Sequence, residues 1–244
     1  ESWNIGGIRT SGVSGAQPLT FNQLKVHYTL LKAVADNLYV GVGYHLDIHY
    51  NIQDLSLDLE SPEPTLTSHY AYSLTYGFDP NKYVSSGTSF NVVWDSRDHT
   101  VSAYQGSFLQ ASYRVNPAQL GSEKSYQQLY LEARVFKGLS KTISRHLIGL
   151  WAIGHFTTAG DVPYLHLPAI GYDMRNRIGR GYVVGRFRGP SWVTTEMEYR
   201  FPISQNGLFG GVLFGSLTTT SRASLVVGNE TLDRLDLFEA IRPA

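Results

Sequence analysis

LYVGVGYHLDIHYNI, residues 38–52, alternates apolar side chains with small or polar ones over its whole length. An alternation with a period of two predicts a β-strand with one apolar face. Strands of soluble proteins average about five or six residues, whereas a strand that crosses a bilayer at a tilt needs about 9–11 and often continues beyond it. The length of this stretch therefore favours a membrane-spanning strand.

The same alternation recurs along the chain. The expected strands are 21–35, 38–52, 87–97, 106–116, 125–137, 146–158, 191–204 and 207–219, with a ninth that begins near residue 237. The period alone does not say which face is inside, because a soluble ligand-binding barrel inverts the same pattern. Strand length, Glu and Arg on one face, and abundant Tyr and Trp favour a barrel with lipid outside and a polar lumen.

The connections between these strands alternate between short and long. Short connections are expected at 36–37, 98–105 and 204–206, and long ones at 53–86, 159–190 and 220–235. Outer-membrane barrels place short turns in the periplasm and long loops outside. The segment from Tyr70 to Phe78 also alternates, but a spanning strand there would break this order. We therefore expect it to belong to an extracellular excursion.

The composition excludes several classes of protein. The chain has 244 residues, 20 Lys plus Arg, 20 Asp plus Glu, 16% charged residues and no cysteine. Soluble domains usually carry about 25% charged residues, so neither a disordered nor a nucleic-acid-binding protein is indicated. Zero cysteine excludes disulfides, thiolate-bound zinc and thiol nucleophiles. The longest apolar run, Leu147 to Phe156, is short and interrupted by glycine, so no spanning helix is expected.

The ends of the sequence suggest that the barrel continues beyond it. Residues 1–20, rich in Gly and Ser, are expected to be a loop or a strand remnant, and residues 21–244 an incomplete transmembrane barrel domain. Closed single-chain outer-membrane barrels have an even number of strands, whereas this sequence stops just as a ninth strand begins. Further strands are therefore expected outside it.

Two motifs resemble one known family. Trp94-Asp95-Ser96-Arg97-Asp98, followed by a hairpin that restarts at Gly106, resembles a strand end of the BamA/TamA family of bacterial surface antigens. The more specific resemblance combines three pieces in the order and spacing of that family: Arg180-Gly181-Tyr182, Gly185-Arg186-Phe187-Arg188 and Glu198-Tyr199-Arg200-Phe201-Pro202. The resemblance covers roughly residues 20–244.

The resemblance implies that the 159–190 loop is extracellular and folds back into the lumen, where acidic groups of the inner wall hold Arg180. Glu196, Glu198 and Arg200 share one polar face of a strand and are the expected wall residues. Arginine suits this role because its planar fork pairs with a carboxylate through two hydrogen bonds. The alternative is a basic loop whose arginines are solvated or contact lipopolysaccharide phosphates.

One position departs from the family pattern. Family members usually place an Asp two residues before a Gly of the next strand as a second partner for the loop arginine, and Leu213 stands there in this chain. The resemblance implies a barrel that inserts, assembles or translocates proteins at the outer membrane of a Gram-negative bacterium. Its partners would be outer-membrane lipids, lipopolysaccharide, and unfolded client proteins or subunits of an envelope complex. Leu213 and the missing POTRA repeats leave open a non-insertase subunit.

Enzyme chemistry finds little support in the sequence. Neither a Gly-x-Ser-x-Gly elbow nor a His-Glu-x-x-His motif occurs. His45, Asp47 and His49 share one strand face and could hold a metal or act as an acid/base pair, but neighbours on that face lie about 6–7 Å apart. They are expected to line a wet lumen, and no enzyme activity, metal or cofactor is predicted. An outer-membrane hydrolase would require His45 or His49 to be essential.

Overall fold

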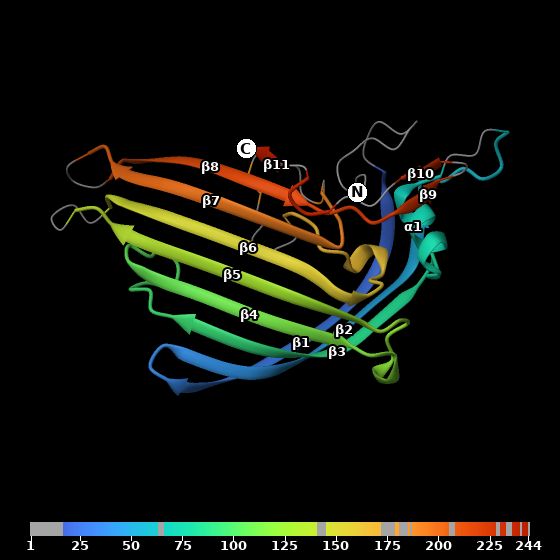
Figure 1. Cartoon of the computed structure of the whole chain (residues 1–244), viewed down its shortest axis with the longest axis horizontal. Helices are drawn as coiled ribbons and strands as arrows, with labels where there is room; N and C mark the ends of the chain where they lie inside the picture. The colour runs from blue at the N-terminus through green and yellow to red at the C-terminus, as the bar shows by residue number, and fades with distance from the viewer. Residues whose placement is uncertain are drawn as a thin grey trace.

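One curved antiparallel sheet dominates the structure (Figure 1). This computed structural model describes residues 17–62, 66–140, 145–171, 179–180, 185, 187–204, 208–227, 230–232, 236–239 and 241–243. The sheet has nine strands in the order β1-β2-β3-β4-β5-β6-β7-β8-β11. The eight long strands are β1 (Leu19–Ala35), β2 (Leu38–Asp54), β3 (Tyr83–Asp95), β4 (Gly106–Asn116), β5 (Tyr126–Gly138), β6 (Leu147–Gly160), β7 (Ser191–Pro202) and β8 (Gly210–Thr220).

The predicted all-β, antiparallel fold is confirmed, and each of the eight long strands overlaps the stretch expected from its alternation. The ninth strand begins later than expected, because residues 237–238 form a turn and β11 comprises only Ile241–Pro243. A small hairpin of β9 (Leu225–Val227) and β10 (Glu230–Leu232) lies within a connection that was expected to be a loop.

The two faces of the sheet differ in chemistry. Large apolar side chains cover the convex face and are exposed, among them Leu30 at 76%, Phe90 at 64% and Met197 at 56%. The concave face, called the lumen face from here on, holds buried polar and charged side chains such as Asp47 and Glu198. An exposed apolar surface of this extent on every long strand fits contact with lipid tails.

The hairpin turns lie at one end of the sheet and the longer connections at the other (Figure 1). The turn between β1 and β2 uses Asn37 at φ 62°, a left-handed conformation that Asn tolerates. The β1 and β2 strands also contain a bulge, at which Asn51 has φ 52°. Bulges increase the local twist of a strand pair and help to curve a sheet.

The segment that alternates between Tyr70 and Phe78 is largely helical rather than extended, so its period of two is misleading. It forms α1 (Ser68–Tyr76) at the end of the sheet with the long connections (Figure 1). Thr67 caps the helix by accepting a hydrogen bond from the Tyr70 backbone N–H, and Gly77 ends it at φ 62°. Tyr72 and Tyr76, one helical turn apart, stack at a centroid distance of 4.4 Å. Among the described residues, no helix is long and apolar enough to cross a membrane.

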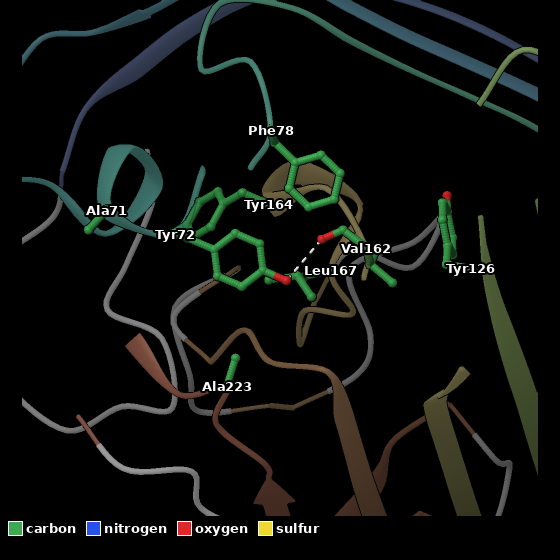
Figure 2. Packing of buried hydrophobic residues seen from close by; sticks show 8 residues of the cluster. All are labelled: Ala71, Tyr72, Phe78, Tyr126, Val162, Tyr164, Leu167 and Ala223. Carbon is green, nitrogen blue, oxygen red and sulfur yellow. Dashed lines mark hydrogen bonds between the residues drawn. The ribbon is translucent and has the colours of Figure 1, made fainter. Parts of the chain in front are cut away.

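The helix α1 packs on the loop that follows β6. This loop contains the short 3₁₀ helix η2 (Tyr164–His166). Tyr72 contacts Tyr164 and donates a hydrogen bond from its hydroxyl to the Val162 carbonyl oxygen at 2.9 Å (Figure 2). The apolar cluster also contains Ala71, Phe78, Tyr126 of β5, Leu167 and Ala223, and it ties three separate connections together.

The sheet does not close on itself within the residues that the structure describes. Within the described part of the chain, β1 pairs only with β2 and forms one edge, while β11 pairs with β8 at the other edge. The 17 residues of β1 are exposed along almost their whole length. One edge therefore presents an extended row of backbone hydrogen-bonding groups.

Candidate functional site: the lumen loop and its wall

The connection between β6 and β7, residues 161–190, is called the lumen loop. Its described parts form a short ladder of backbone hydrogen bonds. Ile170 donates to the Phe187 carbonyl oxygen at 3.0 Å, Gly185 donates to the Ile170 carbonyl oxygen at 2.8 Å, and Ala169 forms a bridge with Arg188. The two arms of the loop therefore satisfy each other's backbone groups, which allows the loop to leave the solvent.

The loop packs on the wall through an apolar cluster. Ile170 and Phe187 of the loop are buried against Ile153 of β6 and Trp192 of β7. Full burial of such a side chain contributes about 1.5–3 kcal/mol relative to its exposed state. The base of the loop is thus bound to the lumen face, as expected for a loop that folds back into the barrel.

Arg180, near the described tip of the loop, lies against two carboxylates of β7. Its Nη2 atom is 3.4 Å from Glu196 Oε1 and also contacts Glu198 Oε1. The guanidinium lies 5.0 Å from the ring centroid of Phe214 on β8, a cation–π distance. Gly179 precedes it at φ 73°, which favours glycine. The structure thus brings Arg180 together with the wall residues named from the sequence.

The wall itself carries a repeated pattern of an acid followed two positions later by an arginine. The pairs are Asp95 with Arg97, Glu132 with Arg134, and Glu198 with Arg200. All three guanidinium groups also lie over aromatic rings: Arg97 is 4.7 Å from the Phe108 centroid, Arg134 is 4.6 Å from that of Trp151, and Arg200 is 5.7 Å from that of Phe136. With Arg180 and Glu196, the set comprises four arginines and four carboxylates. The four arginines, Glu196 and Glu198 border a cavity of about 70 Å³. The wall is therefore neutral but densely charged.

Leu213 does not occupy a place beside Arg180, contrary to the expectation. Cross-strand register pairs Tyr199 with Leu213 and Glu198 with Phe214. Because side chains alternate along a strand, Phe214 shares the lumen face with Glu198, while Leu213 points outward and is 64% exposed. The residue that β8 offers to Arg180 is an aromatic ring, and Leu213 belongs to the lipid-facing surface.

The turn motif after β3 builds a compact hairpin at the short-turn end. Arg97 donates from Nε and Nη2 to the two oxygens of Asp95, both at 2.8 Å. Asp98 accepts from the backbone N–H groups of Tyr104 and Gln105. Slight burial would raise the pKa of Asp98, but these donors hold it below its usual value.

Gly106 restarts the chain after this turn at φ 99°. A Cβ atom at this position would lie 2.3 Å from the Ser96 carbonyl oxygen. The motif therefore requires glycine both for its backbone conformation and for the close approach of two strands.

The remaining predicted loop residues divide into two groups. Gly181, Tyr182 and Arg186 lie outside the described residues. Gly185 adopts φ 74°, and Arg188 is buried, with Nη1 2.9 Å from the Tyr164 carbonyl oxygen. Arg188 thus braces the two arms of the loop from within, so a solvated position is excluded for this arginine.

The three polar residues of β2 have different partners. His45 Nε2 is 2.8 Å from Ser89 Oγ, Asp47 binds His27 at 2.9 Å, and Asp47 also accepts from Arg114 at 3.0 Å. In the described ranges, no group of three or more His, Asp or Glu side chains is close enough to hold a metal. The β2 residues therefore belong to separate hydrogen-bond pairs.

The sequence did not identify two further contacts of the loop. His166 of η2 lies 2.7 Å from Ser85 Oγ and 2.9 Å from His49 Nδ1. Trp192 and Ile153 receive the base of the loop. The alternation along each strand places these wall residues on its polar or buried face. It does not predict which of them contacts a residue of a long loop, because such a contact leaves no periodic pattern in the sequence.

Comparisons with known proteins agree with this architecture. A family profile described as the Omp85 superfamily domain matches residues 38–222. Among solved structures, the chain is similar to BamA from Haemophilus ducreyi lacking POTRA domains 1–3, with a TM-score of 0.59 and 16% sequence identity. The match covers 80% of this chain and 41% of that chain, and at this identity it concerns the fold. No curated protein sequence matches the chain significantly.

The resemblance to BamA/TamA-type barrels that the two motifs carry is thus confirmed. The chain belongs to the Omp85 superfamily and is a β-barrel protein of the Gram-negative outer membrane.

Proposed function

We propose that this chain is the barrel of a component that inserts, assembles or translocates proteins at the outer membrane. The observation that carries the proposal is the combination of an Omp85 barrel with a lumen loop whose Arg180 pairs with Glu198. The matching structure, BamA, shares the fold and supports the same class of function.

The proposed mechanism is mechanical and electrostatic. An incoming strand would form backbone hydrogen bonds with the exposed edge of β1, which pairs only with β2 within the described ranges. The lumen loop would brace the wall while the edge opens, because it is fastened to β6 and β7 through Ile170 and Arg180. Neither step needs a nucleophile or a cofactor, so we propose no enzyme activity.

Depletion of the protein tests this function directly. An insertase should lower the amounts of many outer-membrane proteins together, as measured by quantitative proteomics of isolated outer membranes. Re-expression of the unmodified protein should restore them. Unchanged levels of all outer-membrane proteins would contradict the proposal.

The alternative is a barrel subunit of an envelope complex without insertase activity. The β8 sequence GGVLFGSLTTT favours it, because this strand offers Arg180 a Phe ring and contains no carboxylate. In this case depletion should lower only the direct partner. Lipids and lipopolysaccharide are proposed to contact the exposed apolar face in either case.

A hydrolase is the least supported alternative. His45 and His49 have separate hydrogen-bond partners, and His49 is 2% exposed. Loss of a measurable hydrolytic activity in His45→Ala or in His49→Ala would be needed to support it.

A further inference from the structure

The lumen loop has a second attachment, on the wall opposite its Arg180 contact. The helix η2 lies against β2 and β3, where the Leu165 backbone N–H donates to the Tyr83 hydroxyl at 3.0 Å. His166 Nδ1 is 2.7 Å from Ser85 Oγ, and His166 Nε2 is 2.9 Å from His49 Nδ1. His49 and Ser85 are buried at 2% and 0% exposure. One loop histidine therefore makes contacts to two wall strands.

The contact between the imidazoles of His166 and His49 depends on how many protons the two rings carry. A neutral imidazole has one N–H donor and one acceptor nitrogen, whereas the protonated ring has two donors and no acceptor. The hydrogen bond between His166 Nε2 and His49 Nδ1 contains a single proton, which one nitrogen donates and the other accepts. Protonation of His166 alone keeps this hydrogen bond, because its Nε2–H can donate to His49 Nδ1; when His49 is protonated as well, two N–H groups face each other at 2.9 Å and the bond is lost. The docked pair therefore takes up at most one additional proton without losing the contact, whereas the two released rings take up two.

The surroundings offer little to compensate a new positive charge. Asp47, two positions before His49 on the same face of β2, already binds His27 and Arg114. The charged and titratable groups that surround the pair are Lys25 and His27 on β1, Asp47 on β2, Tyr83 on β3, Arg114 on β4, Tyr126 on β5, which bonds to Ser85, and Arg188 in the loop. Burial, followed by the nearby His49, lowers the pKa of His166 from 6.5 to about 3.

We propose that His166 is a proton-sensitive positioning residue that holds the lumen loop against β2 and β3 at neutral pH and releases it in acid. Arg180 provides the other attachment, through Glu198 on β7. Acid therefore frees the η2 end of the loop while the Arg180 end stays bound. The inference rests on the proposed bracing role, but its readout is the position of the loop rather than protein insertion.

The sign of the effect follows from proton linkage. A released His166 binds a proton near its ordinary pKa of 6.5, whereas the docked ring binds one only near 3. Docking is therefore unaffected above about pH 6.5 and weakens as the pH falls from there toward about 3. In this window the ratio of released to docked loop rises about tenfold per pH unit.

Hydrogen exchange of the purified protein in detergent micelles tests the proposal. Peptides that cover 161–171 should lose protection between pH 6.5 and pH 4.5, by about 100-fold after correction for the intrinsic exchange rate. Peptides from β7 should keep their protection. His166→Gln, which retains a donor and an acceptor but does not titrate, should abolish the pH response.

His146→Gln is the matched control, because His146 lies next to β6 at the short-turn end and bonds to the Tyr199 hydroxyl instead of the loop. It should leave the pH response intact. Heat-modifiable migration in gel electrophoresis checks that each variant is folded. A wild-type response that is flat between pH 6.5 and 4.5, or one that persists in folded His166→Gln, would overturn the proposal. Neither result would affect the depletion test of insertase function.

Discussion

Glu198 pairs with Arg180 of the lumen loop through one carboxylate oxygen and with Arg200 of its own strand through the other. The Arg200 Nε atom donates to Glu198 Oε2 at 2.7 Å, so the carboxylate is held in place from within β7. The wall residue is therefore oriented before the loop arginine reaches it. Such orientation lowers the conformational entropy that is lost when the loop docks.

Arg180→Ala should leave a folded barrel with an undocked loop tip and lost activity. We expect the loop attachment to weaken by about 1–2 kcal/mol, since Arg180 is about a third exposed and Arg200 still compensates Glu198. Limited proteolysis of the loop and complementation of a depleted strain measure the two effects. Arg145→Ala, which removes a charge from an exposed turn residue, is the control. Full function with an unchanged cleavage rate would refute the bracing role.

Glu198→Gln should release the loop more than Glu196→Gln. Glu198 contacts two arginines, whereas Glu196 pairs with one arginine among the described residues, Arg180 at 3.4 Å. A double-mutant cycle of each change with Arg180→Ala isolates the coupling, which we expect to be about 1 kcal/mol for Glu198 and smaller for Glu196. Equal coupling energies for the two carboxylates would contradict this ranking.

Leu213→Asp should affect the stability of the barrel and Phe214→Asp the attachment of the lumen loop, because the two side chains lie on opposite faces of β8. Leu213→Asp places a carboxylate in lipid and should destabilise the folded barrel by about 1–3 kcal/mol without a specific effect on the loop. Phe214→Asp places the carboxylate under Arg180, replacing a cation–π contact with an ion pair. Folding titrations in urea and loop proteolysis distinguish the two. A tighter loop in Leu213→Asp would show that our strand register is wrong.

Gly106→Ala should destabilise the hairpin more than Gly121→Ala. Both glycines have nearly the same backbone conformation, with φ of 99° and 98°, but only Gly106 has an atom close to the added Cβ, the Ser96 oxygen at 2.3 Å. The strain of the left-handed conformation costs about 1–2 kcal/mol in both variants. The steric clash should add about another 1–3 kcal/mol in Gly106→Ala. Urea-induced unfolding measures both, and equal losses would indicate that the turn relaxes freely.

The eight long strands follow closely from the sequence, because a period of two reports directly on the two faces of a strand in a barrel wall. The helix α1 did not, since Tyr70, Tyr72, Leu74 and Tyr76 alternate with smaller or polar residues and mimic a strand. Its caps, Thr67 and Gly77, were the signals that could have corrected this. The side-chain direction of Leu213 also required the register of β7 and β8, which a family motif does not contain.

The sequence by itself determined the antiparallel strands, their apolar outer face, the alternation of short and long connections, and the candidate pair of Arg180 with Glu198. These are consequences of local periodicity and of a motif with fixed spacing. Only the tertiary structure decided that Phe214 lies beneath Arg180 and that His166 reaches Ser85 and His49. The physical reason is that strand register and loop docking depend on contacts between residues far apart in the chain, which no local pattern encodes.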